Sequence, residues 1–320
     1  GLVMYRLVIS PLAWRLTRGC NYRVFTHKTV LQIVTTLLDG AKVPHRMRTE
    51  GNRAPRQRTL TVQYGESDWA FICRLLEQEG FFFYFTQSGQ GHRLEVVDHA
   101  SLVPVMAAPS TLDLRAPDPA MPSGEQVFDF SFSRRLHRGQ VVLDDYNPDH
   151  PALNLQVMSP DPEDGDQSSA RRRPDEQYHY PGDYPLAEQG KLLARTRREA
   201  EQAAAAGGEG RSDCARLAAG SWFTLKGSDD SEDSYMLAEV RHLGDKSTED
   251  LEGGALDRRL SYENHFNCVE RAAPYRPPRV TPRPSVQGVQ TALVVGHGEE
   301  EISTDKQGRV MVRFRWDRLG

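Results

Sequence analysis

Apolar residues recur at the three- and four-residue spacing of an amphipathic helix between residues 30 and 40. Thr29, just before this segment, is a favourable N-cap, and Gln32 stands where its side chain can complete a capping box. Gly40 ends the pattern. The apolar face consists of Val30, Ile33, Val34, Leu37 and Leu38. The segment is therefore predicted to be a helix with one buried face.

A second helix is predicted directly before an aromatic strand. It begins at Ser67 or Asp68 and ends at Gly80, which can adopt the left-handed cap conformation. Five aromatic residues follow, Phe81-Phe-Phe-Tyr-Phe85. Because this run is too short for a helix and too continuous for a half-exposed strand, we expect a strand buried on both faces, with an aromatic binding box as the less favoured alternative. Residues 5 to about 98 are thus predicted to form an α+β block.

The middle of the chain is strand-like, after a Pro- and Ala-rich connection at residues 104–124. The predicted strands are residues 127–132, 140–143, 222–225, 235–240 and 260–266. Polar turns between them are typical of an antiparallel barrel or sandwich. One helix interrupts the series at residues 185–206, with proline in its first turn and Gly207 and Gly208 as its stop.

Prolines crowd residues 273–285, and because each proline fixes φ, an extended semi-rigid spacer at a domain boundary is predicted there. Beyond it, residues 291–295 and 309–316 have strand character, with a turn at residues 305–308. The chain also begins and stops in strand-like sequence. We therefore interpret it as a fragment that is cut at both ends.

Composition narrows the classes of function. The chain has 320 residues, enough for two or three domains. Forty Lys and Arg residues against 44 Asp and Glu residues give a net charge of −4, which provides no positive field for a nucleic acid. No basic region with an apolar core marks a signal peptide, and no apolar run reaches the roughly 20 residues of a membrane span. Nucleic-acid binding, classical export and stable membrane insertion are disfavoured.

Motifs of common enzymes are missing from the sequence. It has no G-x-S-x-G, H-E-x-x-H or Walker A pattern, and no G-x-G-x-x-G after a strand. The four cysteines form no C-x-x-C pair, so we expect reduced, structural thiols; they are Cys20, Cys73, Cys214 and Cys268. No catalytic, cofactor-binding or metal-binding residue is predicted.

Three clusters contain metal-ligating side chains, but none has a second pair at ligand spacing. They are Tyr178-His-Tyr180, His265 with Cys268, and His137 near Asp144, Asp145 and His150. Each is more often an ordinary strand or loop. The acidic stretches at residues 161–166 and 228–233 follow no EF-hand pattern and are interpreted as solvated loops, with a calcium site as the alternative.

An acidic pair and a basic tract could each be either ordinary surface residues or functional groups. Glu77 and Glu79 are of the type that a glycosidase uses as its carboxylate pair, but a chain with 44 acidic residues contains such pairs by chance. The basic tract Arg171-Arg-Arg173 adjoins an acidic loop and has no interleaved aromatic residues. We interpret the acid pair as a chance occurrence and the basic tract as solvated surface.

Several ordered segments together carry a family resemblance. Three of them are Tyr64-Gly-Glu-Ser-Asp-Trp69, Leu143-Asp-Asp-Tyr-Asn-Pro148 and Tyr180-Pro-Gly182. The others are residues 5–14, 22–25, 29–33, 74–80, 217–223, 290–296, 304–310 and 314–318. In this order they resemble the VgrG family, the spike hub of bacterial type VI secretion, which is similar to hub and spike proteins of contractile phage tails. The resemblance covers nearly the whole chain.

The resemblance implies a mainly β fold with α+β insertions: two antiparallel β-barrel hub domains, as in phage tail hubs, followed by the start of an OB-fold. The implied divisions are 1–10, the end of a strand of a truncated first barrel; 11–103, the α+β insertion with the remaining first-barrel strands; 104–124, the connection; 125–272, the second barrel; 273–285, the linker; and 286–320, a truncated spike OB-fold.

A structural role without catalysis is also implied. A homotrimer is expected to cap the hexameric Hcp tube, contact baseplate components, help to puncture a target envelope and deliver effectors. An effector or a PAAR tip protein is expected to bind through a C-terminal spike beyond this chain. The implied location is the cytoplasm during assembly and the target cell after secretion. The alternatives are a phage baseplate hub or tail spike, and an envelope-cleaving hydrolase domain carried by a spike.

Overall fold

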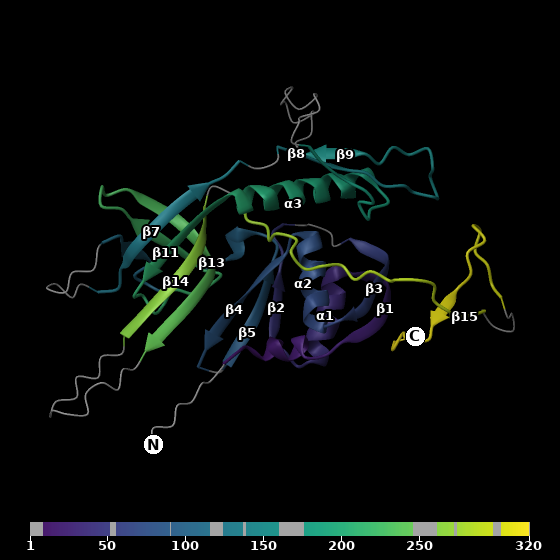
Figure 1. Cartoon of the computed structure of the whole chain (residues 1–320), viewed down its shortest axis with the longest axis horizontal. Coiled ribbons are helices and arrows are strands. Elements are labelled where there is room, and N and C mark those ends of the chain that lie inside the picture. Colours follow the sequence, from purple (N-terminus) through teal and green to yellow (C-terminus); the bar gives the residue numbers. More distant parts are fainter. Residues whose placement is uncertain are drawn as a thin grey trace, which may run out of the picture.

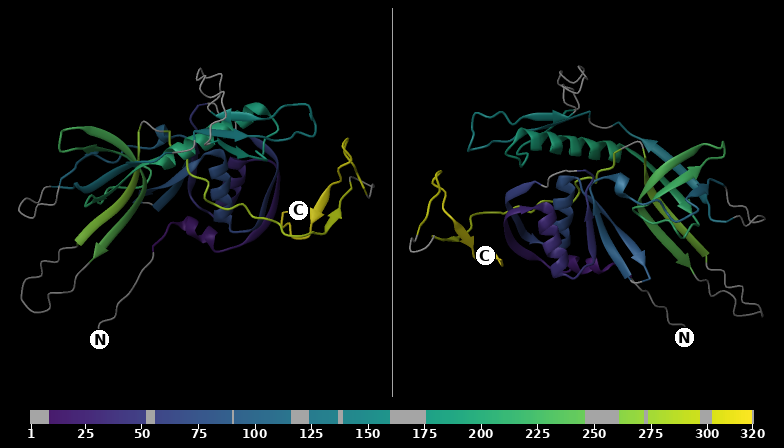
Figure 2. Two further views of the ribbon diagram at one scale, coloured as in Figure 1. Left: turned by 45° about the horizontal axis from the view of Figure 1, so that its top comes forward. Right: turned by 180° about the vertical axis from the view of Figure 1, so that it is seen from behind.

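The fold is mainly β with a few helices, and its parts are arranged around a central α/β unit (Figure 1). A curled sheet lies on one side of this unit, a long helix lies along it, and a small hairpin lies at the opposite end, as the turned views confirm (Figure 2). The computed structural model describes residues 9–51, 56–89, 91–115, 124–136, 139–159, 176–245, 261–271, 274–296 and 302–319.

The central unit combines two small sheets with two helices. Strand β1 pairs antiparallel with β3, and a second sheet has the order β2-β5-β4, with β2 parallel to β5. Its elements are η1 (Leu12–Thr17), β1 (Asn21–Thr29), α1 (Val30–Gly40), β2 (His45–Arg48), β3 (Gln57–Glu66), α2 (Asp68–Glu79), β4 (Phe82–Ser88), β5 (Gly91–Val97) and η2 (Ala100–Leu102). Of the strand end predicted at residues 1–10, only residues 9 and 10 are described, and they are not in a strand.

Both predicted helices are confirmed together with their capping chemistry. The Gln32 amide donates to Thr29 Oγ1 at 3.2 Å, and the Thr29 amide donates to Gln32 Oε1 at 2.9 Å. Ser67 accepts from the Ala70 amide at the start of α2, and Gly80 ends that helix at φ 76°. All five residues of the predicted apolar face of α1 are buried.

The aromatic strand β4 lies between two cores, and the expected burial holds for the face of Phe82 and Tyr84, whereas the other face is only partly buried. Phe82 and Tyr84 pack in a cluster that also contains residues of the curled sheet. Phe81 is buried in the core around α1 and α2, while Phe83 and Phe85 pack against that core and are only partly buried.

The curled sheet has six strands in the order β6-β12-β13-β14-β11-β7. They are β6 (Thr111–Asp113), β7 (Val127–Arg134), β11 (Ala206–Ser212), β12 (Trp222–Lys226), β13 (Glu232–Asp245) and β14 (Ser261–Glu270). All neighbours are antiparallel except β6 and β12. The two edges meet where Leu114 bridges Val127 and the Arg115 amide donates to the Val127 carbonyl at 2.9 Å. The sheet thus wraps around Phe223 and Phe266, which are almost fully buried.

One predicted role is wrong in this region: Gly207 and Gly208 do not stop the helix. The helix α3 (Ala187–Ala205) passes through Ala206 directly into β11. A Cβ at Gly208 would lie 2.8 Å from the Phe130 ring, and one at Gly210 would lie 2.5 Å from Phe266. These glycines are therefore needed because aromatic rings approach the strand closely.

The predicted strand at residues 140–143 also belongs elsewhere than expected. It is β8 (Gln140–Leu143), the centre of a three-stranded sheet with β9 (Val157–Ser159) and β10 (Glu176–His179), and not part of the curled sheet. This sheet packs on α3 around Tyr184, whose ring touches Gly182 and Gly190 so closely that neither position has room for a Cβ.

The C-terminal part consists of an extended segment and a hairpin. Residues 274–290, here called the linker segment, run along the body, and β15 (Ala292–Val294) then pairs antiparallel with β16 (Val312–Phe314). The predicted turn is confirmed, because the Gly308 amide donates to the Asp305 carbonyl at 3.0 Å. Both strands are shorter than predicted.

Candidate functional site

The linker segment, predicted as an extended semi-rigid spacer, is docked on the body by side-chain contacts. Arg276 Nε donates to Glu199 Oε2 of α3 at 2.8 Å. Its Nη1 donates to the Gly80 carbonyl at the end of α2, at 3.2 Å, and also to the Asp98 carbonyl after β5. The Arg276 and Glu199 side chains are 13% and 9% exposed. One guanidinium group therefore joins the linker segment to three elements.

Two further contacts hold the same segment. The Thr281 amide and hydroxyl donate to the two carboxylate oxygens of Glu77, at 2.9 and 2.6 Å. The Tyr275 ring meets the Phe82 ring edge-on, with 4.9 Å between the ring centroids. The segment is thus bound by polar contacts and by packing.

Glu79, at the end of α2, is paired with two arginines that approach from β3 and the residue before it. Arg56 and Arg58 donate to Glu79 Oε1 at 2.9 and 2.6 Å. Burial alone raises the pKa of Glu79, but the charges and hydrogen bonds of Arg58 and Arg56 outweigh it and lower the pKa below its ordinary value. A carboxylate held ionised in this way is unsuited to act as a general acid. Glu77 and Glu79 are therefore structural groups in this fold, and the glycosidase interpretation finds no support.

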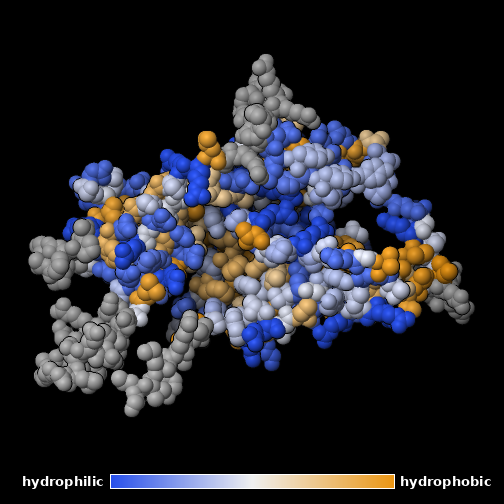
Figure 3. Space-filling view, viewed as in Figure 1, coloured by the Kyte–Doolittle hydropathy of each residue, from blue (hydrophilic) through white to orange (hydrophobic). Residues whose placement is uncertain are grey.

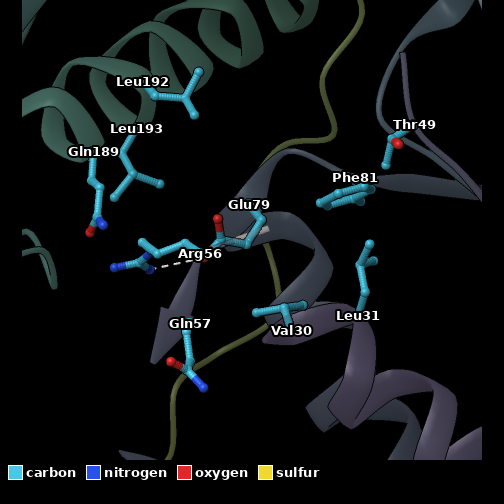
Figure 4. Close-up of a pocket in the computed structure, with 10 residues that line it drawn as sticks. All are labelled: Val30, Leu31, Thr49, Arg56, Gln57, Glu79, Phe81, Gln189, Leu192 and Leu193. Carbon is cyan, nitrogen blue, oxygen red and sulfur yellow. Dashed lines mark hydrogen bonds and ion pairs between the residues drawn. The ribbon is translucent and has the colours of Figure 1, made fainter. Parts of the chain in front are cut away.

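A cavity of about 320 Å³ lies between the Glu79–Arg56 pair and α3 (Figure 4). Leu192 and Leu193 descend from α3, while Val30 and Leu31 face them from α1. Among the described residues that line it, there is no histidine, cysteine or serine, and the Glu79 carboxylate is already paired with Arg56. The arrangement suits packing between elements better than catalysis.

The structure does not bring together the candidate metal ligands that it describes. His265 is exposed and contacts Glu263, whereas Cys268, three residues along β14, is buried among apolar side chains. Tyr178 donates to Asp144 Oδ2 at 3.2 Å, and Asp145 accepts from the Tyr184 amide. Within the described ranges, no three His, Cys, Asp or Glu side chains gather as a possible metal site.

The remaining candidates divide between surface loops and undescribed positions. In the acidic stretch at residues 228–233, Asp229 accepts from Ser231, and Asp230 pairs with Lys226. His137, the acidic stretch 161–166 and the tract 171–173 lie outside the described residues. The four cysteines are free, with Cys214 and Cys268 buried. In the part of the chain that the structure covers, no helix is both long and apolar enough to cross a bilayer.

The hairpin β15–β16 presents apolar side chains to solvent on both of its faces. Figure 3 shows apolar residues gathered at this end of the molecule. Neighbouring residues of a strand point to opposite faces, and Leu293 and Val294 are both about half exposed, as are Met311 and Val312 on the other side of the hairpin. A groove of about 820 Å³ separates part of the hairpin and linker segment from β3.

A small aromatic cluster anchors the hairpin to the central unit. The Trp316 ring lies 5.3 Å from Tyr64 and 6.1 Å from Tyr22, measured between centroids. Beside it, Asp317 Oδ1 accepts from the Val24 amide at 3.1 Å, and the Arg318 amide donates to the Tyr22 carbonyl at 3.2 Å. These bonds lie at the edge of β1 that faces away from β3 and has no neighbouring strand in the described fold.

The fold and its extended contact surfaces agree with comparisons to known proteins. Residues 1–248 match the family model described as phage tail baseplate hub (GPD), well over half of the 320 residues. The chain belongs to the phage tail baseplate hub family. Two type VI secretion system spike proteins of Pseudomonas aeruginosa, VgrG5 and VgrG4b, are each 33% identical to all of this hub chain, which spans 41% and 40% of their lengths. The resemblance to VgrG proteins predicted from the motifs is confirmed.

Solved structures share the hub fold. The E. coli c3393 protein is described as a component of the type VI secretion system with structural similarity to the T4 tail proteins gp27 and gp5. It matches with a TM-score of 0.62 and 21% identity over 95% of this chain and 66% of its own. The 43 kDa tail protein of prophage MuSo2 from Shewanella oneidensis matches with a TM-score of 0.53 and 14% identity over 82% of this chain and 72% of its own.

Sequence reasoning missed the residues that hold the linker segment of the hub. Arg276 and Thr281 bind groups about 80 to 200 residues away along the chain, and no local pattern reports such contacts. One available signal was the placing of Arg276, Arg279 and Arg283 among the prolines, because a purely solvated spacer has no need of regularly placed guanidinium groups.

Proposed function

We propose that the chain is the hub region of a type VI secretion spike, a structural protein that acts as a homotrimer on the end of the Hcp tube. The tube and baseplate components are the proposed partners, and helping to puncture an envelope and to deliver effectors is the proposed task. Tip proteins and effectors are proposed to bind the part of the relatives that this chain does not span. Assembly in the cytoplasm and transfer into a target cell follow from the same proposal.

The finer architecture is part of this proposal. The antiparallel pair β4–β5 and the curled sheet, which is antiparallel except at β6–β12, are proposed to belong to the two barrels, and β15–β16 to begin an OB-fold. The divisions at residues 10, 103, 124, 272 and 285 remain predictions on the same basis. In a closed trimer, each chain uses the same two patches, so three barrel pairs form a ring of six similar units that matches a hexameric tube.

The observation that carries the proposal is the apolar hairpin. An isolated two-stranded hairpin is marginal in water, and this one exposes apolar side chains on both faces. Large exposed apolar patches mark contact surfaces with other protein. Paired carboxylates such as Glu79, in contrast, do not support the hydrolase alternative.

Light scattering on the purified chain, alone and with added hexameric Hcp, tests this function. We expect the mass of a trimer, and a heavier complex when the tube protein is present. A monomer that leaves Hcp unbound contradicts the proposal for this chain. The second candidate function is a phage baseplate hub, which the prophage tail protein of similar fold favours. The same measurement with a phage tail tube protein distinguishes the two, because a phage hub should bind that protein and not Hcp.

A further inference from the structure

We propose that the linker segment is a rigid strap, and that Arg276 is the positioning residue that fixes the direction of the C-terminal hairpin relative to the hub. This deepens the proposed function and rests on it for its purpose. A spike that is driven by a push along its axis transmits that push only if its base does not swing.

The geometry at Arg276 determines an orientation as well as a contact. A guanidinium group is planar, and its donors have a fixed arrangement, so three acceptors on three elements define how it lies. A long side chain that bonded to one flexible partner would leave the backbone free to rotate. Arg276 instead meets α3, the end of α2 and the backbone after β5 together.

Gly80 makes this close approach possible. It lies at φ 76°, and a Cβ there would stand 2.3 Å from Thr196 Cγ2 and 3.3 Å from Arg276 Cδ. The same glycine therefore ends α2, admits α3 and leaves room for the linker segment. Its carbonyl belongs to the negative end of the α2 dipole, which favours a cation at this place.

Charge supports a permanent pairing at this point. Glu199 accepts from Arg195 as well as from Arg276. Burial alone raises the pKa of Glu199, but hydrogen bonds from Arg276 and Arg195 lower it below its ordinary value, so the carboxylate is ionised at neutral pH.

Two more contacts hold the chain to the body beyond Arg276, one in the linker segment and one in the hairpin. Thr281 is bound to Glu77 five residues after Arg276, and the prolines between these positions restrict φ. Trp316 then holds the hairpin itself against Tyr22 and Tyr64. A segment that is held at successive points cannot sample the directions that are open to a free linker.

The test measures a distance distribution within one chain by pulsed electron paramagnetic resonance. Spin labels at Glu188→Cys on α3 and Lys306→Cys in the hairpin turn are both exposed, and Cys20→Ser removes the exposed native thiol. Burial raises the pKa of Cys73 to about 12, so this thiol stays protonated and unreactive. Dilution with unlabelled chain removes distances between subunits.

Arg276→Gln and Thr281→Val are compared with Arg283→Gln as a matched control on the same segment. The Arg283–Asp183 pair has exposed side chains, at 66% and 41%, and such pairs contribute little. We expect one narrow distribution for the parent and the control. Because Trp316 also holds the hairpin, Arg276→Gln is compared in a Trp316→Ala background, and there we expect a distribution about twice as wide as in Trp316→Ala alone, since a released linker explores a coil-like range. Circular dichroism and the Tm of the body show whether each variant is folded.

A broad distribution in the parent overturns the proposal. So does an unchanged width when Arg276→Gln and Thr281→Val are added together to the folded Trp316→Ala chain. If Arg276→Gln fails to fold, the milder Thr281→Val decides by the same criterion. The measurement does not depend on trimer formation or tube binding, so failure of the strap and failure of the hub function are distinguishable.

Discussion

Among the described residues, two buried carboxylates are paired with arginines where elements meet. Glu79 joins β3 to α2 through Arg56 and Arg58, and Glu199 joins α3 to the linker segment through Arg276. Removing one partner of such a pair leaves an uncompensated charge in a poorly solvated place, which costs more than the pair itself contributes. Single substitutions at these positions are therefore expected to have large effects on stability.

Glu79→Gln is expected to lower the free energy of unfolding by about 3–5 kcal/mol, because two arginines lose their shared counter-charge. Glu270→Gln is the control, since its pair with Arg134 is largely exposed and should be worth about 0–1 kcal/mol. Urea unfolding at neutral pH measures both variants. Equal decreases in the unfolding free energy of the two variants would show that burial does not determine how much the ion pair contributes to stability.

The same carboxylate predicts a pH dependence. The pKa of Glu79 in the folded chain lies below the ordinary 4.5, so its contribution to stability is complete at neutral pH. It is lost as the pH falls below about 4.5 and through the folded pKa, because the unfolded chain then binds the proton more readily. The difference in unfolding free energy between the parent and Glu79→Gln should shrink on acidification. A constant difference down to about pH 3 would contradict this.

Gly80→Ala is expected to destabilise the chain for two separable reasons. The left-handed backbone costs about 1–2 kcal/mol for a residue with a Cβ. The contact with Thr196 Cγ2 adds about 1–3 kcal/mol of overpacking. The double variant Gly80→Ala/Thr196→Ser removes that methyl group and should recover the second part only, as measured by urea unfolding against Thr196→Ser alone.

At the scale of elements, predictions held where the controlling chemistry is local. Thr29, Ser67 and Gly80 cap the helices within a few residues of the helix ends, so those ends could be derived from the sequence. The sheet to which each strand belongs could not be derived in this way, because it is decided by pairings between distant segments. The sequence of β8 predicts a strand just as those of the curled sheet do, yet β8 pairs in parallel with β10 and packs on α3.

The candidate site shows the same division. The sequence identified Glu77 and Glu79 as acids on one helix, but not the arginines and the threonine that bind them. Those partners come from β3, from the residue before it and from the linker segment, and alternation or capping patterns carry no information on such contacts. The proline content predicts an extended spacer, whereas the docking of this segment on the body is visible only in the tertiary structure.

Trp316→Ala is expected to release the hairpin while the body stays folded. The lost contacts with Tyr22 and Tyr64 are worth about 2–3 kcal/mol, so amides of β15 and β16 should exchange about a hundredfold faster. Hydrogen exchange measured by mass spectrometry reports this by segment. Trp14→Ala, at an exposed position, is the control and should leave the hairpin unchanged.

At the scale of the whole molecule, polar networks hold the body together and the main uncovered apolar surface that Figure 3 shows is at the hairpin end. The curled sheet and the central unit share a core through β4, so the body acts as one unit. The hub family, the fold and this exposed surface together favour association as the main activity of the chain.

Val312→Lys is expected to weaken that association. Val312 is partly exposed on β16, and a lysine buried against an apolar partner surface costs several kcal/mol, so the midpoint concentration of assembly should rise at least about a hundredfold. Leu136→Lys, at a fully exposed apolar position far along the chain, is the control. Sedimentation velocity over a concentration series compares the two, and an unchanged parent-like mass in Val312→Lys would exclude this face from the contact.

The strand order of the curled sheet also has a consequence for synthesis on the ribosome. Among the described residues, the core around α1 and α2 consists of residues between 12 and 96, so it can form while most of the chain is still being made. In the curled sheet, β14 is the last strand in sequence, and it stands between β13 and β11. Until residue 270 has left the ribosome, β13 and β11 each have an edge without a partner strand, and such edges can pair with other chains. Translation that stalls between β13 and β14 should therefore yield aggregates and not a smaller soluble product.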